Sequence, residues 1–257
     1  MADGHNTQDH DPLEAYRQMR ETLENAHAYN RADEHDACGV GLVVQMDGTP
    51  RREIVQMAIR ALKAVWHRGA VDADGKTGDG AGIRLDVPQE FFKAQIIHTG
   101  HEPNEDLPIC VGQIFMPRTD LKAQEAARTI VESEILRLGF YVYGWRQVPI
   151  DTSYIGEKAD RSRPEIAQIM FCDPKGREGS DLERMLYVCR RRTEKRARAA
   201  NIPDFYICSM SSQAIIYKGM FLAEDIDKFY PDLRDKRFTS SVAIYHQRYS
   251  TNTFPQW

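Results

Sequence analysis

The stretch Asp36-Ala37-Cys38-Gly39-Val40-Gly41-Leu42-Val43-Val44 decides how this sequence folds, because a single cysteine opens an apolar, β-branched run after a long polar lead. The run predicts a buried strand over residues 38–46, with Asp47-Gly48 as the turn after it. Its two glycines leave room for the close approach of another backbone or a substrate. Cys38 is therefore a candidate nucleophile. The alternative is a structural thiol, since free cysteines are among the most buried residue types.

Composition indicates a globular chain without a disulfide framework or a structural metal site. The 257 residues are 42% hydrophobic, which is enough for a sizeable core. Five cysteines, an odd number, are widely spaced and show neither a C-x-x-C pair nor zinc-ligand spacing. No secretory signal and no apolar run of membrane-spanning length is visible, and a net charge of -4 gives no reason to expect nucleic acid as a partner. We therefore expect a cytoplasmic protein that binds neither nucleic acid nor a membrane.

Residues 1–37 differ in charge from the rest of the chain. They contain nine acidic residues and three arginines, a net charge of about -6, so that the remainder is slightly positive. Leu13 to Ala28 could form a short surface helix, although it offers few apolar residues for docking. The segment has the character of a leader or arm. A disordered N-terminus without a role is the alternative.

Strands and helices follow one another irregularly in the remainder. Alternating or continuous apolar runs predict further strands at residues 83–87, 109–116, 140–148, 166–172, 205–209, 214–218 and 241–246. The strands 205–209 and 214–218 are expected to pair through a turn at Ser211-Ser212. Helical spacing and capping residues predict helices at residues 54–66, 120–138, 180–199 and 223–229. This order favours an α+β fold with helices outside paired antiparallel sheets.

Two of these helices and one loop bear on function. The first helix is predicted to bury Ile54, Leu62 and Trp66 on one face. The glycine- and aspartate-rich sequence from Asp72 to Gly82 is predicted to be a loop that a ligand can approach closely. The arginine-rich run over residues 190–198 lacks interleaved aromatics, which indicates a solvated or partner-facing helix rather than a nucleic-acid site.

A second polar cluster, His246-Gln247-Arg248-Tyr249-Ser250-Thr251-Asn252-Thr253, follows the last predicted strand. The guanidinium of Arg248 could hold a carboxylate through two parallel hydrogen bonds, which would give orientation as well as charge. The alternative is an arginine that is solvated or salt-bridged at a strand end. The cluster is therefore a candidate binding site for a carboxylate.

Four motifs, in this order, resemble the glutamine amidotransferase domain of the glutamate synthase large subunit. They are Cys38-Gly-Val-Gly-Leu, His67-Arg-Gly-Ala, Gly78-Asp-Gly-Ala-Gly-Ile83 and Arg248-Tyr-Ser-Thr-Asn-Thr-Phe-Pro-Gln-Trp257. The resemblance spans residues 38–257. It implies an N-terminal nucleophile hydrolase fold, a four-layer αββα sandwich of two antiparallel sheets between helical layers, incomplete at its C-terminus.

The same resemblance assigns roles to individual residues. Cys38 is implied as the catalytic nucleophile, which becomes residue one when residues 1–37 are removed as a propeptide. The substrate is L-glutamine, whose α-carboxylate Arg248 is expected to hold, while Arg68 lies close to the nucleophile. Thr251 and Asn252 are expected in the substrate site. The freed α-amino group, ordinarily of pKa about 7.7 to 8.0, acts as the base for its own thiol, so the uncut chain is expected to be inactive.

In the complete enzyme of this family, the released ammonia is used for the reductive amination of 2-oxoglutarate to glutamate. The resemblance therefore implies FMN and an iron-sulfur cluster outside residues 1–257, no cofactor within them, and a small reductase subunit or ferredoxin as partner. NADPH, NADH and ferredoxin all stay open as electron donors. The resemblance also places an Asn-Gly pair that forms the oxyanion hole, and an aspartate that holds the substrate amine, beyond Trp257. We therefore expect an N-terminal fragment with little or no glutaminase activity alone.

Two other functions stay open at this point. One is a different amidotransferase with an N-terminal cysteine, such as the phosphoribosyl-pyrophosphate or glucosamine-phosphate enzymes. The long leader and the sequence Arg248-Tyr-Ser-Thr-Asn-Thr-Phe favour glutamate synthase over these enzymes. The other is a noncatalytic regulatory module that retains the fold.

Overall fold

The computed structural model describes residues 12–26, 38–250 and 253–257. The chain divides into two units, residues 1–36 and 37–257. In the first unit, helix α1 (Pro12–Ala26) occupies the segment for which a surface helix was predicted. Three of its apolar side chains, those of Tyr16, Met19 and Leu23, are exposed.

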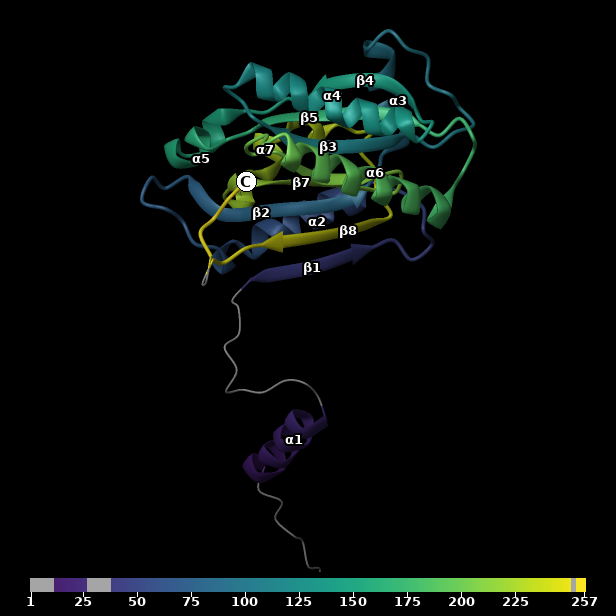
Figure 1. Ribbon diagram of the computed structural model, residues 1–257. Helices are drawn as coiled ribbons and strands as arrows, with labels where there is room; N and C mark the ends of the chain where they lie inside the picture. Colours follow the sequence, from purple (N-terminus) through teal and green to yellow (C-terminus); the bar gives the residue numbers. More distant parts are fainter. Residues whose placement is uncertain (1–11, 27–37, 251–252) are drawn as a thin grey trace, which may run out of the picture. The chain divides into compact units, whose positions relative to one another are not determined.

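The described part of the second unit contains eight strands in two four-stranded antiparallel sheets (Figure 1). The first sheet has the order β1-β8-β2-β7, and the second has the order β4-β5-β3-β6. The strands of the first sheet are β1 (Gly39–Val44), β2 (Thr77–Asp86), β7 (Ala214–Phe221) and β8 (Val242–Gln247). Those of the second sheet are β3 (Cys110–Met116), β4 (Tyr141–Gln147), β5 (Glu165–Cys172) and β6 (Tyr206–Ser211). The eight predicted strands and the α+β class are confirmed.

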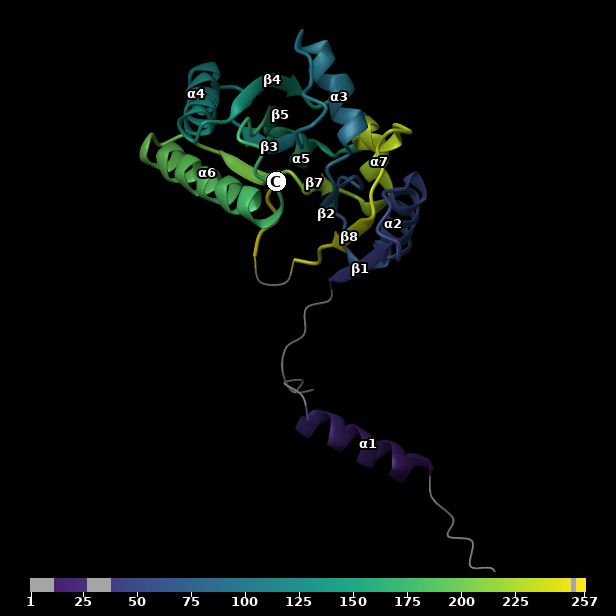
Figure 2. The same ribbon diagram turned by 90° about the vertical axis from the view of Figure 1, so that its right-hand side faces the viewer.

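Helix α2 lies on the outer side of the first sheet, and α4 and α6 lie on the outer side of the second (Figure 2). Helix α2 contacts β1 and β8 of the first sheet, while α4 and α6 pack on each other against the second. The helices of the second unit are α2 (Arg52–Ala64), α3 (Gln89–His98), α4 (Leu121–Arg137), α5 (Glu157–Arg161), α6 (Gly179–Ala199) and α7 (Ile226–Phe229). Short 3-10 turns occur at Trp66–Arg68, Thr152–Tyr154, Ala223–Asp225 and Pro231–Arg234.

Two hydrophobic cores hold these layers together. The larger one joins residues of both sheets, such as Ile83 and Val111, with α2, α3 and α7. The smaller one lies between the second sheet and the helices α4 and α6, where Leu182 and Leu186 are fully buried. Each such side chain contributes about 1.5 to 3 kcal/mol when it leaves water. Helix α2 covers one face of the first sheet.

The ends of α4 follow from its flanking residues. The Asp120 side chain accepts a hydrogen bond from the backbone N–H of Ala123 at 3.0 Å, so it satisfies one of the otherwise unpaired donors of the first turn. Gly139 has φ +81°, the left-handed conformation that commonly terminates a helix and that glycine adopts without strain. Both predicted boundaries are confirmed.

The structure corrects three expectations of the sequence. Trp66 is 62% exposed, because α2 ends at Ala64 and the 3-10 turn moves Trp66 out of the buried stripe. Residues 77–82 belong to strand β2 instead of a loop. The glycines there serve strand packing: a Cβ at Gly78 would lie 2.7 Å from the Phe221 carbonyl oxygen of β7.

The third correction concerns the strands β6 and β7, which lie in different sheets. β6 pairs with β3 and β7 pairs with β2, so the turn between them carries the chain from one sheet to the other. Glu183 of α6 accepts hydrogen bonds from the N–H and the hydroxyl of Ser212 and from the hydroxyl of Ser211. This carboxylate anchors the turn from outside the sheets.

Helix α3 is absent from the helices that the sequence predicted.

A buried carboxylate connects α4 to α6 and gives a stability prediction. Glu134 is 1% exposed and accepts hydrogen bonds from Arg137 at 2.9 Å and Arg196 at 2.7 Å. Burial alone would raise the pKa of Glu134, but the hydrogen bonds and charges of Arg196 and Arg137 outweigh it, and the net pKa is lowered. Glu134 therefore stabilises the fold above its ordinary pKa of about 4.3, and that contribution is lost as the pH falls below it.

We expect Glu134→Gln to lower the free energy of unfolding by about 1 to 2 kcal/mol at pH 7, because the substitution removes a charge that two arginines bind. The difference from the wild type should shrink below pH 4. Urea unfolding at both pH values, followed by circular dichroism, measures it. Glu125→Gln, at an exposed position of the same helix, is the matched control and should stay within about 0.5 kcal/mol. Equal destabilisation by Glu134→Gln at both pH values would contradict the charge explanation.

Candidate active site

Strands β1 and β8 bring the two polar clusters of the sequence together. Gly39 of β1 lies opposite Gln247 of β8 in the antiparallel register, so the residues just before β1 face those just after β8. The backbone N–H of Tyr249 donates to the Cys38 Sγ at 3.4 Å. The Cys38 thiol in turn donates to the Tyr249 carbonyl oxygen at 3.7 Å. Cys38, the candidate nucleophile, thus contacts the segment that contains Arg248.

Glycines allow the backbone to pack closely around this point. A Cβ at Gly41 would lie 2.1 Å from the Tyr245 hydroxyl oxygen, and one at Gly69 would lie 1.9 Å from the Gln247 Nε2. A Cβ at Gly39 would be 3.2 Å from the Arg68 Cβ. The turn that carries Arg68 therefore packs against the residue next to Cys38, while the Arg68 side chain itself is exposed.

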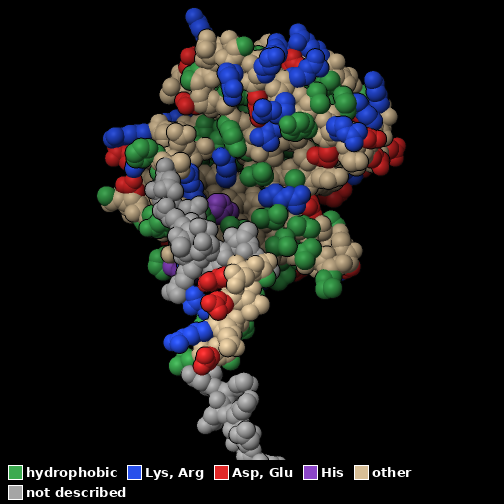
Figure 3. Space-filling model, turned by 60° about the horizontal axis from the view of Figure 1, so that its bottom comes forward, with side chains coloured by type: hydrophobic (Ala, Val, Ile, Leu, Met, Phe, Trp, Pro, Cys, Tyr) green, Lys and Arg blue, Asp and Glu red, His purple; other side chains and the backbone are tan. Residues whose placement is uncertain are grey.

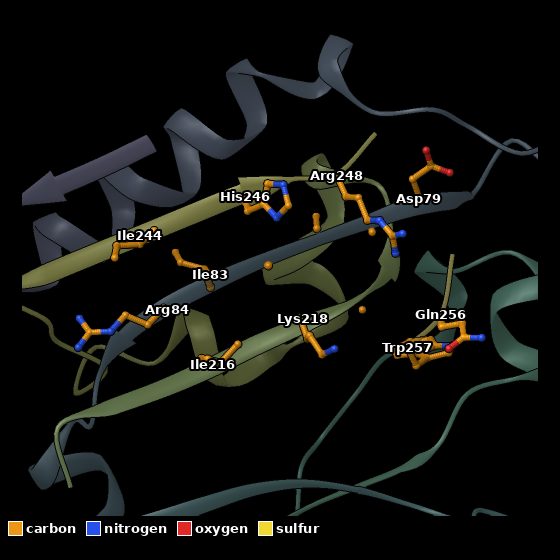
Figure 4. A pocket seen from close by; sticks show the side chains of 14 residues that line it. Asp79, Ile83, Arg84, Ile216, Lys218, Ile244, His246, Arg248, Gln256 and Trp257 are labelled. Atoms are coloured by element: carbon orange, nitrogen blue, oxygen red, sulfur yellow. The ribbon is translucent and has the colours of Figure 1, made fainter. Parts of the chain in front are cut away.

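Arg248 lines a pocket of about 320 Å³ on the face of the first sheet that points away from α2. Figure 4 shows Arg248 and Asp79 at one end of this pocket, Lys218 near its middle and Arg84 at the other end. The backbone N–H of Arg248 donates to the Gly80 carbonyl oxygen at 2.9 Å, and its guanidinium donates to the Thr253 hydroxyl. These bonds fix Arg248 between strand β2 and the end of the chain described here.

The pocket is electropositive at neutral pH. Burial lowers the pKa of Lys218, whose ammonium lies 4.1 Å from the centre of the Tyr206 ring, and the nearby Arg248 lowers it further. His246 has a lowered pKa, first because of burial and second because of the positive charge of Arg248, so it is neutral at pH 7. The three cations Arg84, Lys218 and Arg248 outnumber the single carboxylate of Asp79, so the pocket suits a carboxylate-bearing ligand.

Apolar side chains continue this face beyond the pocket. Val40, Leu42 and Val44 of β1 are exposed, next to Ile244 at the edge of the pocket, whereas the alternate positions of β1 and β8 point to α2. In Figure 3, hydrophobic side chains lie next to lysine and arginine side chains on one side of the molecule.

The other four cysteines are buried and differ from Cys38, which is partly exposed. Burial raises the pKa of Cys189 and of Cys208 to about 12. Burial also raises the pKa of Cys172, and that of Cys110 lies well above its ordinary value for the same reason. These thiols are protonated at neutral pH and are poor nucleophiles.

The structure adds two residues to the predicted site. Asp79 and Lys218 line the pocket with Arg248, although sequence analysis gave neither a role. An aspartate between Gly78 and Gly80 is a signal that could have pointed to Asp79, whereas Lys218 lies in an ordinary strand pattern.

Thr251 and Asn252, the other two predicted substrate-binding residues, lie outside the described residues. Within those residues, no cluster of three metal-binding side chains occurs, and no helix is long and apolar enough to cross a membrane.

Comparison with known proteins identifies the family. The family model for class-II glutamine amidotransferases matches residues 38–257. The chain belongs to this family. This class-II amidotransferase sequence is 60% identical over 242 residues to the NADPH glutamate synthase large chain of Azospirillum brasilense, a match that covers 94% of the chain and 16% of that relative. The resemblance inferred from the four motifs, and the fold class it implied, are confirmed.

Other relatives of this amidotransferase chain are also glutamate synthases. It is 40% identical over 227 residues to ferredoxin-dependent glutamate synthase 2 of Synechocystis, covering 88% of the chain and 14% of that relative. It is 36% identical over 233 residues to the NADPH glutamate synthase large chain of Bacillus subtilis, covering 89% of the chain and 15% of that relative. The chain therefore spans only a small part of the length of the curated relatives it matches.

Proposed function

We propose that this chain supplies the glutamine-hydrolysing site of a glutamate synthase, with Cys38 as the nucleophile. The thiolate attacks the side-chain amide carbon of L-glutamine, ammonia leaves, and water hydrolyses the resulting glutamyl thioester to glutamate. One observation carries the proposal: in a chain of this family, a partly exposed cysteine at the start of β1 contacts the segment that bears Arg248. The four buried thiols lack this exposure.

Arg248 is proposed to hold the α-carboxylate of glutamine. Its position at the rim of an electropositive pocket supports this role, and Lys218 adds a second positive charge to the same pocket. Arg68, on the turn that packs against Gly39, is proposed to order the surroundings of the nucleophile. Thr251 and Asn252 stay predicted substrate residues, because they directly follow the segment that contacts Cys38.

Removal of residues 1–37 is proposed to activate the site. While Ala37 is attached, the Cys38 nitrogen is an amide and cannot accept the thiol proton; after cleavage it is an amine of suitable basicity. Residues 38–257 are then the amidotransferase domain, which agrees with the range that the family model matches. The acidic charge of residues 1–37 fits a separate leader.

For the whole protein we propose that the ammonia serves the reductive amination of 2-oxoglutarate. FMN and an iron-sulfur cluster would act in regions outside residues 1–257, with a small reductase subunit or ferredoxin as electron-transfer partner. The names of the relatives support this reaction over those of other N-terminal-cysteine amidotransferases. The cytosol is the proposed compartment, in keeping with five free cysteines.

A diazoketone analogue of glutamine tests the proposal on the full-length protein. We expect one covalent label, located by peptide mapping on Cys38, and protection from labelling by excess L-glutamine. Glutamate analogues without the diazoketone group should leave no label. A protein that folds but carries no label on Cys38 would favour the noncatalytic regulatory module instead.

A further inference from the structure

We propose that Asp79 is a positioning residue of this site, which holds the segment 248–250 so that the backbone N–H of Tyr249 points at the Cys38 sulfur. This role rests on the proposed function, because positioning of the Cys38 sulfur matters for catalysis only if Cys38 is the nucleophile. The geometry that supports it joins residues of β2, the segment after β8 and the Cys38 sulfur.

Two bonds from β2 clamp the chain on either side of Tyr249. The Asp79 carboxylate oxygen Oδ2 accepts a hydrogen bond from the Ser250 N–H at 2.6 Å. On the other side, the Gly80 carbonyl oxygen accepts the Arg248 N–H at 2.9 Å. Tyr249 lies between these two points, and its own N–H, 3.4 Å from the Cys38 Sγ, is left free to donate to the sulfur.

The backbone of β2 explains why a side chain is needed here. The β2–β8 ladder ends at the pair Ala81 and Gln247, so beyond Arg248 no strand carbonyl continues the pairing. The Asp79 carboxylate takes the place of that missing carbonyl at Ser250. Gly80 has φ +128°, a conformation that an L side chain rarely adopts, and the pairing with β7 shifts between Thr77 and Ala81. The irregular backbone allows Asp79 to reach out of the ladder.

A hydrogen bond to a charged acceptor is short and strong, and an N–H held in line with a sulfur stabilises the negative charge that the sulfur carries as it attacks. Loss of the clamp should therefore make Cys38 less reactive. A nearby carboxylate has the opposite electrostatic effect on its own, because its negative charge repels the negative charge on the attacking sulfur. If Asp79 acts by positioning, its removal should lower the reactivity of Cys38; if it acts only by its charge, its removal should raise that reactivity. A pair of variants can separate the two effects.

The test measures the alkylation rate of Cys38 by iodoacetamide at pH 7.5 in the full-length protein, followed by peptide mapping. We expect Asp79→Ala to slow the reaction about threefold to tenfold, as the loss of one such hydrogen bond would. Asp79→Asn keeps an acceptor oxygen and loses the charge, so it should react at least as fast as the wild type. Asp79→Ala reacting as fast as the wild type, or Asp79→Asn being slowed as much as alanine, would overturn the proposal.

Asp86 offers a matched control at the opposite end of the same strand pair. Its Oδ2 accepts the Ser241 N–H at 2.6 Å, the same kind of bond between β2 and the residues beside β8. Asp86→Ala should therefore leave the alkylation rate of Cys38 unchanged; a decrease equal to that of Asp79→Ala would indicate general loosening and overturn the proposal. Alkylation needs no glutamine, so its result is independent of whether the diazoketone labels Cys38.

Discussion

Replacing Cys38 by alanine in the full-length protein is expected to lower glutamine hydrolysis by at least about a thousandfold. The proposed route passes through a thioester, and alanine offers no atom that could form it. Positioning of water by the remaining site cannot replace a covalent step of this kind. Ammonia release from glutamine, measured at saturating substrate, checks the prediction.

Cys172→Ala is the control for this loss. Cys172 lies on β5, is 3% exposed, and has a pKa raised by burial, so its thiol is protonated at neutral pH. Its replacement should cost some stability and leave the turnover within about twofold of the wild type. Retention of most activity by Cys38→Ala would remove the chemical basis of the proposed function.

The second large effect is expected at Asp232, a carboxylate that is 4% exposed in the core between the sheets. It binds Arg146 of β4 through two hydrogen bonds, of 2.7 Å and 3.0 Å, and accepts a third from the Tyr217 hydroxyl at 2.9 Å. Asp232→Ala leaves the guanidinium of Arg146, whose side chain is 12% exposed, without its counter-charge. We expect the free energy of unfolding, measured in urea, to fall by about 3 to 5 kcal/mol.

Two further variants separate charge from packing in this network. The double variant Asp232→Ala with Arg146→Met removes both charges, so it should be more stable than Asp232→Ala alone. Asp181→Ala breaks an ion pair with Arg184 in which both side chains are more than 70% exposed, and it should change stability by less than about 1 kcal/mol. A double variant no more stable than Asp232→Ala would contradict the explanation by an unpaired charge.

The fold was predictable where local signals and burial agree. β1 has an apolar run with a clear turn after it, and α4 has both of its caps in the sequence. α3 was missed because its apolar residues come in adjacent pairs, Phe91-Phe92 and Ile96-Ile97, which give little helical contrast. The glycines of β2 predict a loop when only neighbouring residues are considered, because the strand that packs against them, β7, is more than 100 residues away in the sequence.

The candidate site was predictable as a set of motifs but not as a geometry. Cys38 and Arg248 were both singled out, and the pairing of β1 with β8 explains why residues so distant in sequence meet. The clamp by Asp79 depends on where the β2–β8 ladder ends, which no local pattern reveals. Lys218 enters the pocket only because β7 lies beside β2. The motifs therefore predict which residues belong to the site, and the pairing of distant strands determines which of them lie in contact.

The claim that Cys38 becomes an N-terminal nucleophile is tested most directly by sequencing the N-terminus of the mature full-length protein. Cleavage between Ala37 and Cys38 would supply the α-amino group that serves as the base. We predict a mature chain that begins with Cys38-Gly39-Val40-Gly41. An active mature protein that begins at Met1 or Ala2 would contradict the account.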